Sequence, residues 1–167
     1  VKTGASMCYW HSEHTHMAPK AKAYYGAIAR GGVGLLIIES PAVDWPHGSR
    51  WKERYRVDDD RFIEGMAELA EVIHAEGCPT FVQFWHDGPW QNPLFDPPGL
   101  YEGPPIGASA VNLDVPGDFH RDVIRPLSIG EIEEVIDKFA SAAVRVQKAG
   151  FDGVDLNAAS SHVLHNF

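Results

Sequence analysis

The residues near the carboxyl end of the chain have the types and spacing of an active site. A short apolar strand is predicted at residues 153–156, and Asn157, Ser160 and His162 follow it directly. Amide, hydroxyl and imidazole groups can donate hydrogen bonds, and an imidazole is a plausible general acid near neutral pH. In parallel α/β folds the chemistry usually takes place at the carboxyl ends of strands. We therefore take these three side chains as candidate site residues.

Polar residues also stand at the ends of three other apolar segments. In chain order these are Ser6 to Trp10, Glu39 with Ser40, and Gln83 to His86. The carboxyl ends of parallel strands meet at one face, so the four groups could line one pocket. The alternative for any single residue is that it only marks the point where a strand becomes a loop.

Gln83 is informative because it interrupts the apolar run from Thr80 to Trp85. A buried amide needs partners for its donors and for its acceptor. The edge of a heteroaromatic ligand would supply them in one plane, and so would water or backbone groups. Cys8 could be a reactive thiol near a cofactor, although a small buried apolar side chain is the commoner role of a free cysteine.

Three histidines, His11, His14 and His16, form a His-x-x-His-x-His pattern that could bind a transition metal. No cysteine or second cluster at a recognisable spacing completes such a site. A solvated or pocket-lining loop is therefore the favoured interpretation, and no metal is expected.

The segments between the strand ends are helical in pattern. Apolar residues recur at helical spacing from 19 to 30 and from 59 to 76, and the acidic run Asp58 to Asp60 supplies an N-cap for the second helix. A third helix begins at a capping box formed by Ser128 and Glu131. Its buried stripe is predicted to consist of Ile132, Val135, Ile136, Phe139, Ala143 and Val146.

Strands that alternate with helices predict parallel βαβ units. The strands are expected at 34–39, 80–85 and 153–156, with a weaker one at 1–7. No glycine-rich phosphate loop follows the strands at 1–7 and 34–39, which disfavours a doubly wound dinucleotide-binding sheet and favours an eightfold (β/α)8 TIM barrel. A complete barrel takes about 250 residues, so the chain would supply about the first four βα units. The Pro- and Gly-rich stretch 89–126 is then either a lid over the barrel mouth or a loop without function.

Composition excludes several classes of function. A chain of 167 residues with a net charge of −9 lacks the basic surface that nucleic-acid binding needs. Its two cysteines, Cys8 and Cys78, form no disulfide framework and fit a reducing compartment, and Cys78 is expected to pack in the core. No apolar run approaches the roughly 20 residues that span a membrane, and no signal peptide is visible. We expect a cytoplasmic protein.

Several segments resemble the old yellow enzyme family of flavin-dependent oxidoreductases, which includes dienoyl-CoA reductase and trimethylamine dehydrogenase relatives. The segments are Tyr24 to Glu39, Val82 to Gly88, Pro105 to Ala110, Arg125 to Ile132, Gly150 to Leu156 and Leu164 to Phe167. They occur in the family's order over nearly the whole chain. The resemblance implies an eightfold barrel with FMN at its carboxyl face, of which residues 1–167 would be the N-terminal half.

The same resemblance implies roles for the strand-end residues on the cofactor side. Ser6, Met7 and Cys8 match the first-strand segment that runs along the flavin, and Cys8 matches a flavin-proximal cysteine of one branch. Ser40 matches a small residue that touches the ring. Gln83 matches the glutamine that hydrogen-bonds the pyrimidine edge of the isoalloxazine.

On the substrate side the chain departs from the family pattern. Ene reductases of the family carry a His-His or His-Asn pair, which holds the substrate carbonyl, where this chain has Asn157 and Ser160. His162 stands where the family usually has a tyrosine that donates a proton or forms a pocket wall. Trp10 replaces another common tyrosine, and Pro89 replaces an arginine. We expect Trp10, Asn157 and Ser160 to contact the substrate and His162 to supply the proton.

The resemblance thus implies an NAD(P)H:flavin oxidoreductase that passes hydride through FMN to an activated alkene, such as an enone or an enoyl thioester. One alternative is a dehydrogenase of amines or other donors in the same superfamily, whose iron–sulfur cluster and FAD would need a longer chain. Another is a non-catalytic or metal-binding barrel fragment.

The expected partner is a small molecule, with no nucleic acid and no membrane. Half a barrel exposes an apolar edge, so the 167 residues alone are expected to bind FMN poorly, to lack activity and to form homo-oligomers.

Overall fold

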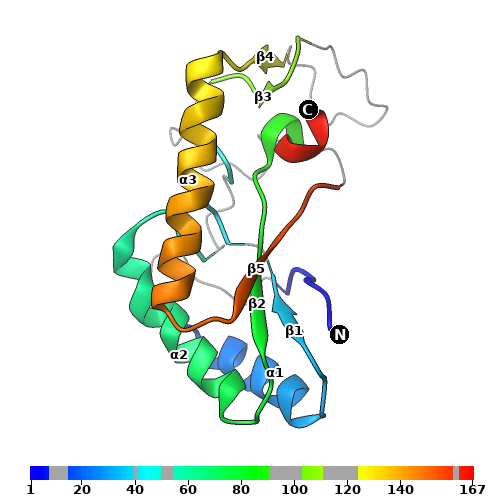
Figure 1. Cartoon of the computed structure of the whole chain (residues 1–167), viewed down its shortest axis with the longest axis vertical. Helices are drawn as coiled ribbons and strands as arrows, with labels where there is room; N and C mark the ends of the chain where they lie inside the picture. Colours follow the sequence, from blue (N-terminus) through cyan, green and yellow to red (C-terminus); the bar gives the residue numbers. More distant parts are fainter. Residues whose placement is uncertain (8–14, 40, 50–54, 91–102, 111–123, 160–161) are drawn as a thin grey trace.

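The computed structural model describes residues 1–7, 15–39, 41–49, 55–90, 103–110, 124–159 and 162–167 (Figure 1). Its helices and strands, in chain order, are α1 (Pro19–Arg30), β1 (Leu36–Ile38), α2 (Ile63–His74), β2 (Thr80–Phe84), β3 (Ile106–Gly107), β4 (Arg125–Pro126), α3 (Ile129–Lys148) and β5 (Gly153–Leu156). Short 3-10 helices occur at Asp60–Phe62, Gly88–Trp90 and Val163–Asn166.

The central sheet is parallel, with the strand order β1-β2-β5. Across the second pairing, Gln83 of β2 stands opposite Asp155 of β5. The amino-terminal segment extends the sheet beyond β1, because Lys2 forms a parallel bridge with Leu36. Four parallel segments therefore follow one another in chain order, as the first four strands of an eightfold barrel do. The predicted α/β class and partial barrel are confirmed.

The first two helices lie where the apolar spacing predicted them. α1 has the predicted bounds of 19–30. The helix predicted at 59–76 forms as a 3-10 turn followed by α2, and the Asp59 side chain accepts a hydrogen bond from the Arg61 amide at its start. The acidic run therefore caps this helix as predicted. α2 packs against both α1 and α3.

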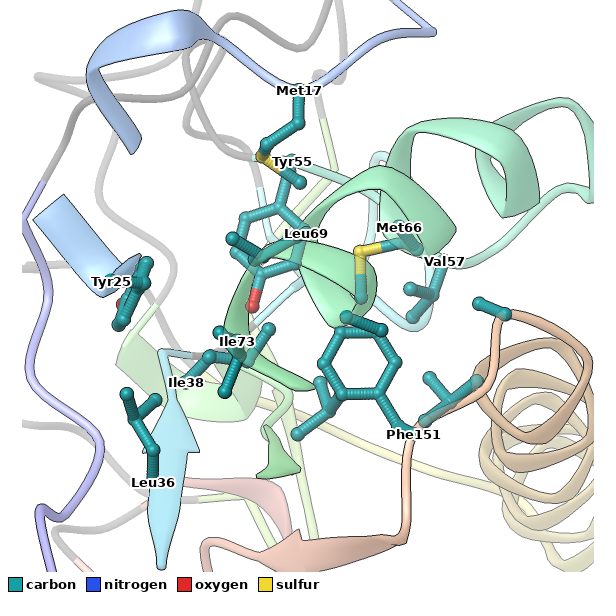
Figure 2. Close-up of a cluster of buried hydrophobic side chains, with 14 of the residues drawn as sticks. Met17, Tyr25, Leu36, Ile38, Tyr55, Val57, Met66, Leu69, Ile73 and Phe151 are labelled. Atoms are coloured by element: carbon teal, nitrogen blue, oxygen red, sulfur yellow. The ribbon is translucent and has the colours of Figure 1, made fainter. Parts of the chain in front are cut away.

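The main hydrophobic core lies between the sheet and the helices (Figure 2). Its fully buried side chains include Tyr25, Leu36, Ile38, Leu69 and Ile73. The predicted packing of Cys78 in the core is confirmed, and burial raises the pKa of its thiol.

Burial alternates along β2 with the two-residue period of a strand. Val82 and Phe84 belong to the core beside the helices, whereas Phe81 and Gln83 are partly exposed. Because successive side chains of a strand point to opposite faces, Gln83 projects from the face of the sheet that the helices leave uncovered.

α3 begins with the predicted capping box. The Ser128 hydroxyl accepts a hydrogen bond from the Glu131 amide, and the Glu131 carboxylate accepts one from the Ser128 amide. Arg125 also donates to this carboxylate, at 2.8 Å. The hydrogen bond from Arg125 and those from Ser128 lower the pKa of Glu131 to about 2.

The predicted buried stripe of α3 is wrong at Ile136, which is 60% exposed. Of the predicted stripe, Val146 is buried, and the remaining residues Ile132, Val135, Phe139 and Ala143 are partly buried. Ala142, which is outside the predicted stripe, is also buried. The reason is visible in Figure 1, where the carboxyl half of α3 lies beside α2 and β5 and its amino half extends toward β4. No described helix combines the length and the apolar character that crossing a membrane requires.

The stretch 89–126 contains one feature that the sequence pattern did not predict. Ile106 of β3 pairs in parallel with Arg125 of β4. Most of the remaining stretch, 91–102 and 111–123, lies outside the described residues, and with it the prediction of a lid.

Candidate functional site

The carboxyl ends of β2 and β5 bring three of the predicted site residues to one place. The Asn157 amide donates to the Phe84 carbonyl at 2.9 Å, which extends the pairing of the two strands. The imidazole of His162 lies edge-on to the Trp85 ring, with centroids 4.5 Å apart. Gln83 stands in β2 just before these contacts. The three predicted residues therefore share one end of two neighbouring strands.

Backbone contacts fix the segment that carries His162. The Val163 amide donates to the His86 carbonyl at 3.0 Å. At Gly88 the backbone has φ of 58°, and a Cβ there would lie 2.9 Å from the Val163 nitrogen. Only glycine meets both conditions. The two segments consequently lie side by side, as Figure 1 shows for the carboxyl terminus and the turn after β2.

The side-chain amide of Gln83 is oriented by its neighbour on β5. Its Nε2 donates to Oδ2 of Asp155 at 2.7 Å. On the other side, a Cβ at Gly4 would lie 2.7 Å from Oε1 of Gln83, so the first strand approaches the amide closely. Asp155 is absent from the predicted site. Given the register between β2 and β5, the two-residue alternation of side chains along β5 would have placed Asp155 on the same face of the sheet as Gln83.

Asn157 has its side-chain carbonyl engaged locally. Oδ1 accepts a hydrogen bond from the Ala159 amide at 3.1 Å, in the manner of an Asx turn. The group that Asn157 offers to a bound molecule is therefore the Nδ2 donor.

The predicted cofactor-binding segment at the amino terminus is attached to β1 through Glu39. This residue is 3% exposed, and its carboxylate accepts a hydrogen bond from the Met7 amide. Its own amide donates to the Tyr25 hydroxyl, and its carbonyl accepts from the Tyr55 hydroxyl. Ser6 is exposed and Met7 is half-buried. A buried carboxylate thus sets the backbone position of Met7.

A buried polar network lies behind the strand ends. Oδ1 of Asp44 accepts from Nζ of Lys138 at 2.9 Å, and Oδ2 lies 3.5 Å from Nε2 of His86. The Gly88 amide donates to Nδ1 of His86, so a neutral imidazole carries its proton on Nε2, facing Asp44. Burial acts to raise the pKa of Asp44, but the nearby His86 imidazole and the Lys138 ammonium outweigh it and hold this pKa below its usual value.

A pocket of about 370 Å³ opens on the flank of this network, between α3 and the residues that follow β1. Its two basic side chains already have partners: Lys138 pairs with Asp44, and Arg145 pairs with Asp60 at 2.7 Å. Of the predicted site residues that the structure describes, none lines it. The pocket is therefore separate from the strand-end site.

Four of the predicted site residues fall outside the described residues: Cys8, Trp10, Ser40 and Ser160. Of the histidine pattern, only His16 is described, and its Nδ1 lies 2.6 Å from the Glu68 carboxylate. Within the described ranges, no three His, Cys, Asp or Glu side chains are grouped so that they could hold a metal ion.

Comparison with known proteins assigns the chain to a family. The family model described as the NADH:flavin oxidoreductase / NADH oxidase family matches residues 3–167. An NADH oxidase of Thermoanaerobacter brockii is 42% identical over 145 residues, which cover 86% of this chain and 21% of that protein. An NADH:acrylate oxidoreductase of Vibrio harveyi is 32% identical over 148 residues, covering 86% of this chain and 13% of that protein.

Among solved structures, the old yellow enzyme homologue of Zymomonas mobilis superposes with a TM-score of 0.79 at 26% identity, over 97% of this chain and 44% of its own. The chain thus spans less than half the length of each of these relatives. The match to the family model over nearly every residue and the shared barrel strands lead to one conclusion: the chain belongs to the NADH:flavin oxidoreductase / NADH oxidase family.

Proposed function

We propose that the protein carrying this sequence is an FMN-dependent oxidoreductase that takes hydride from NADH or NADPH and passes it to an activated alkene. The observation that carries the proposal is the grouping of Gln83, Asn157 and His162 at the carboxyl ends of β2 and β5. An oriented amide, a hydrogen-bond donor and an imidazole stand together there. The Vibrio harveyi relative is named for acrylate, which is an alkene conjugated to a carboxylate.

The strand-end residues fit the pyrimidine edge of a flavin. The Gln83 amide is half-buried and held in one orientation, and Gly4 leaves room beside it that a Cβ would fill. When bound, the flavin supplies the hydride-accepting and hydride-donating centre. The residues to which we assign contact with it are Ser6, Met7, Cys8, Ser40 and Gln83.

Asn157 and Ser160 are assigned to the carbonyl group of the substrate. We assign Nδ2 of Asn157 to the substrate oxygen because its Oδ1 already accepts a hydrogen bond from the Ala159 amide. Negative charge develops on the carbonyl oxygen of the substrate as the conjugated double bond accepts hydride. Donors that are held in place before the reaction stabilise that charge more than water does.

His162 is assigned the proton transfer. Hydride adds to the carbon β to the carbonyl, and the proton from the imidazole adds to the α carbon, so the alkene is reduced to a saturated product and NAD(P)H is oxidised. The contact with Trp85 and the hydrogen bond between Val163 and His86 hold the imidazole in position. Trp10 is assigned to the wall of the substrate pocket.

The test uses the complete natural protein that contains this sequence. We expect it to purify with bound FMN and to oxidise NADH or NADPH faster when acrylate, an enone or an enoyl thioester is added, with the saturated product formed in equal amount. A colourless protein that binds no added FMN would contradict the proposal. A yellow protein that is reduced by amines and transfers nothing to alkenes would favour the donor dehydrogenase instead.

A further inference from the structure

Gln83 and Asp155 face each other across the pairing of β2 and β5. Both are partly buried and project from the sheet face that the helices leave uncovered. The hydrogen bond from Nε2 of Gln83 to Oδ2 of Asp155 measures 2.7 Å. This pair lies beneath the position to which the proposed function assigns the flavin edge.

Asp155 restricts the Gln83 amide to one of its two orientations. A carboxylate accepts hydrogen bonds and donates none, so the amide must turn its Nε2 side to Asp155. A flipped amide would place two acceptor oxygens against each other. Oε1 is consequently turned toward Gly4, where only the lack of a side chain leaves room for it.

We propose that Asp155 is a positioning residue for the flavin, because it fixes which side of the Gln83 amide meets the pyrimidine edge. This inference rests on the proposed function. The pyrimidine part of a flavin has an N–H between two carbonyl groups, and it pairs with an amide that presents its acceptor and its donor in a set order. With Asp155 in place, the Gln83 amide has its acceptor and its donor in this order before the flavin binds. The flavin therefore does not have to select one of two amide orientations.

The carboxylate has a second consequence for the bound flavin. Reduction places negative charge on the pyrimidine part of the ring system, and a nearby carboxylate disfavours that charge. Asp155 therefore lowers the reduction potential of the flavin, in addition to orienting Gln83.

The test compares Asp155→Asn with Asp152→Asn in the complete natural protein that contains this sequence. Asp152→Asn makes the same chemical change just before the start of β5. FMN affinity is followed by quenching of flavin fluorescence, and the reduction potential by equilibration with reference dyes. An asparagine can donate as well as accept, so Gln83 loses its fixed orientation. We expect Asp155→Asn to weaken FMN binding about tenfold, the effect of one lost oriented hydrogen bond, and to make the potential less negative. Asp152→Asn should change neither quantity.

Two further variants separate orientation from general damage. Asp155→Glu keeps a carboxylate and should retain the low potential of the wild type. In a Gln83→Leu background, Asp155→Asn should not weaken FMN binding further, because the residue through which it acts is gone.

A wild-type protein that binds FMN, together with an Asp155→Asn variant of equal affinity and equal potential, would overturn the inference and leave the proposed function standing. An equal loss of affinity in both Gln83 backgrounds would overturn it too. A wild-type protein that binds no FMN would overturn both.

Discussion

Asp44 shows how a single carboxylate connects three parts of the molecule. It follows β1 in the chain, is 4% exposed, and contacts Lys138 of α3 and His86 beyond the end of β2. Gly48 belongs to the same arrangement, because a Cβ there would lie 2.7 Å from Cδ2 of His86. The residue next to His86 is Trp85, which contacts the imidazole of His162. The position of the site therefore depends on a charge that lies outside it.

Asp44→Asn should lower the free energy of unfolding by about 2 kcal/mol, because a buried carboxylate that pairs with Lys138 and lies beside the buried imidazole of His86 becomes a neutral amide. Urea unfolding measures the change. The control is Asp137→Asn, since Asp137 lines the same pocket but is exposed, and no loss is expected there. Equal stabilities of the two variants would show that the network does not stabilise the fold.

His162→Phe removes the proposed proton donor while keeping an aromatic ring beside Trp85. The reoxidation of reduced flavin by an alkene should slow by about 100-fold, the usual contribution of a general acid. Flavin reduction by NAD(P)H should keep its rate, and stopped-flow absorbance separates the two half-reactions. His162→Tyr, which restores a proton donor, should recover part of the loss. If both half-reactions slow equally in His162→Phe, the residue has a structural role only.

The side chains of the site could be predicted from the sequence only in part. Gln83, Asn157 and His162 stand at strand ends, and a local pattern is enough to find such positions. Asp155 was not predicted because its hydrogen bond joins it to Gln83, 72 residues away in the chain. Local periodicity does not give the register between two strands. The partnership of Asp44 with Lys138 was missed for the same reason.

At the scale of elements, Asp152 joins α2, β2 and β5 at the end of the sheet opposite the site. Its Oδ2 accepts from the Thr80 amide and lies 2.8 Å from Nε2 of His74, in the last turn of α2. The hydrogen bond from Thr80 and the contact with His74 lower the pKa of Asp152. A carboxylate whose pKa is lowered by folding stabilises the fold only while it is ionised.

The ionisation of Asp152 predicts that the free energy of unfolding depends on pH. The folded-state pKa of Asp152 lies below the unfolded value of about 3.9, so its contribution is complete above about pH 4 and is lost as the pH falls through the folded pKa. Asp152→Asn should be less stable than the wild type at pH 7 by about 0.5 to 1 kcal/mol, since solvent screens a side chain that is 44% exposed. Thermal unfolding should show the difference shrinking as the pH falls below about 4. A difference that is constant from pH 7 to pH 3 would contradict the assignment.

The elements themselves were predicted well where a period or a cap defines them. α1 and the capping box of α3 follow from apolar spacing and from Ser128 with Glu131. β3 and β4 were missed because strands of two residues are too short to show a period. The burial of Ile136 was predicted wrongly, because an apolar stripe shows which side of a helix is apolar. It does not show how much of the helix length a neighbouring element covers.

At the scale of the whole molecule, several large apolar side chains remain exposed. Leu156 of β5 is 54% exposed, Ile136 of α3 is 60% exposed and Phe167 is 66% exposed. Among the described strands, β5 pairs only with β2, so its other edge presents unpaired backbone groups. A closed barrel has no such edge, and an exposed one is a template for pairing with another chain.

We therefore expect the chain of 167 residues, produced alone, to self-associate at micromolar concentrations and to bind FMN weakly. Sedimentation velocity measures the association. Leu156→Lys and Ile136→Glu should shift the distribution toward the monomer, because a charge at either position must be desolvated when that exposed apolar surface is covered by another chain. Ser141→Glu adds the same charge as Ile136→Glu at an exposed polar residue of the same helix, and it should leave the association unchanged. A wild-type chain that stays monomeric would show that this exposed apolar surface is stable in water. An equal effect of Ile136→Glu and Ser141→Glu, which change the net charge alike, would assign the association to net charge rather than to apolar surface.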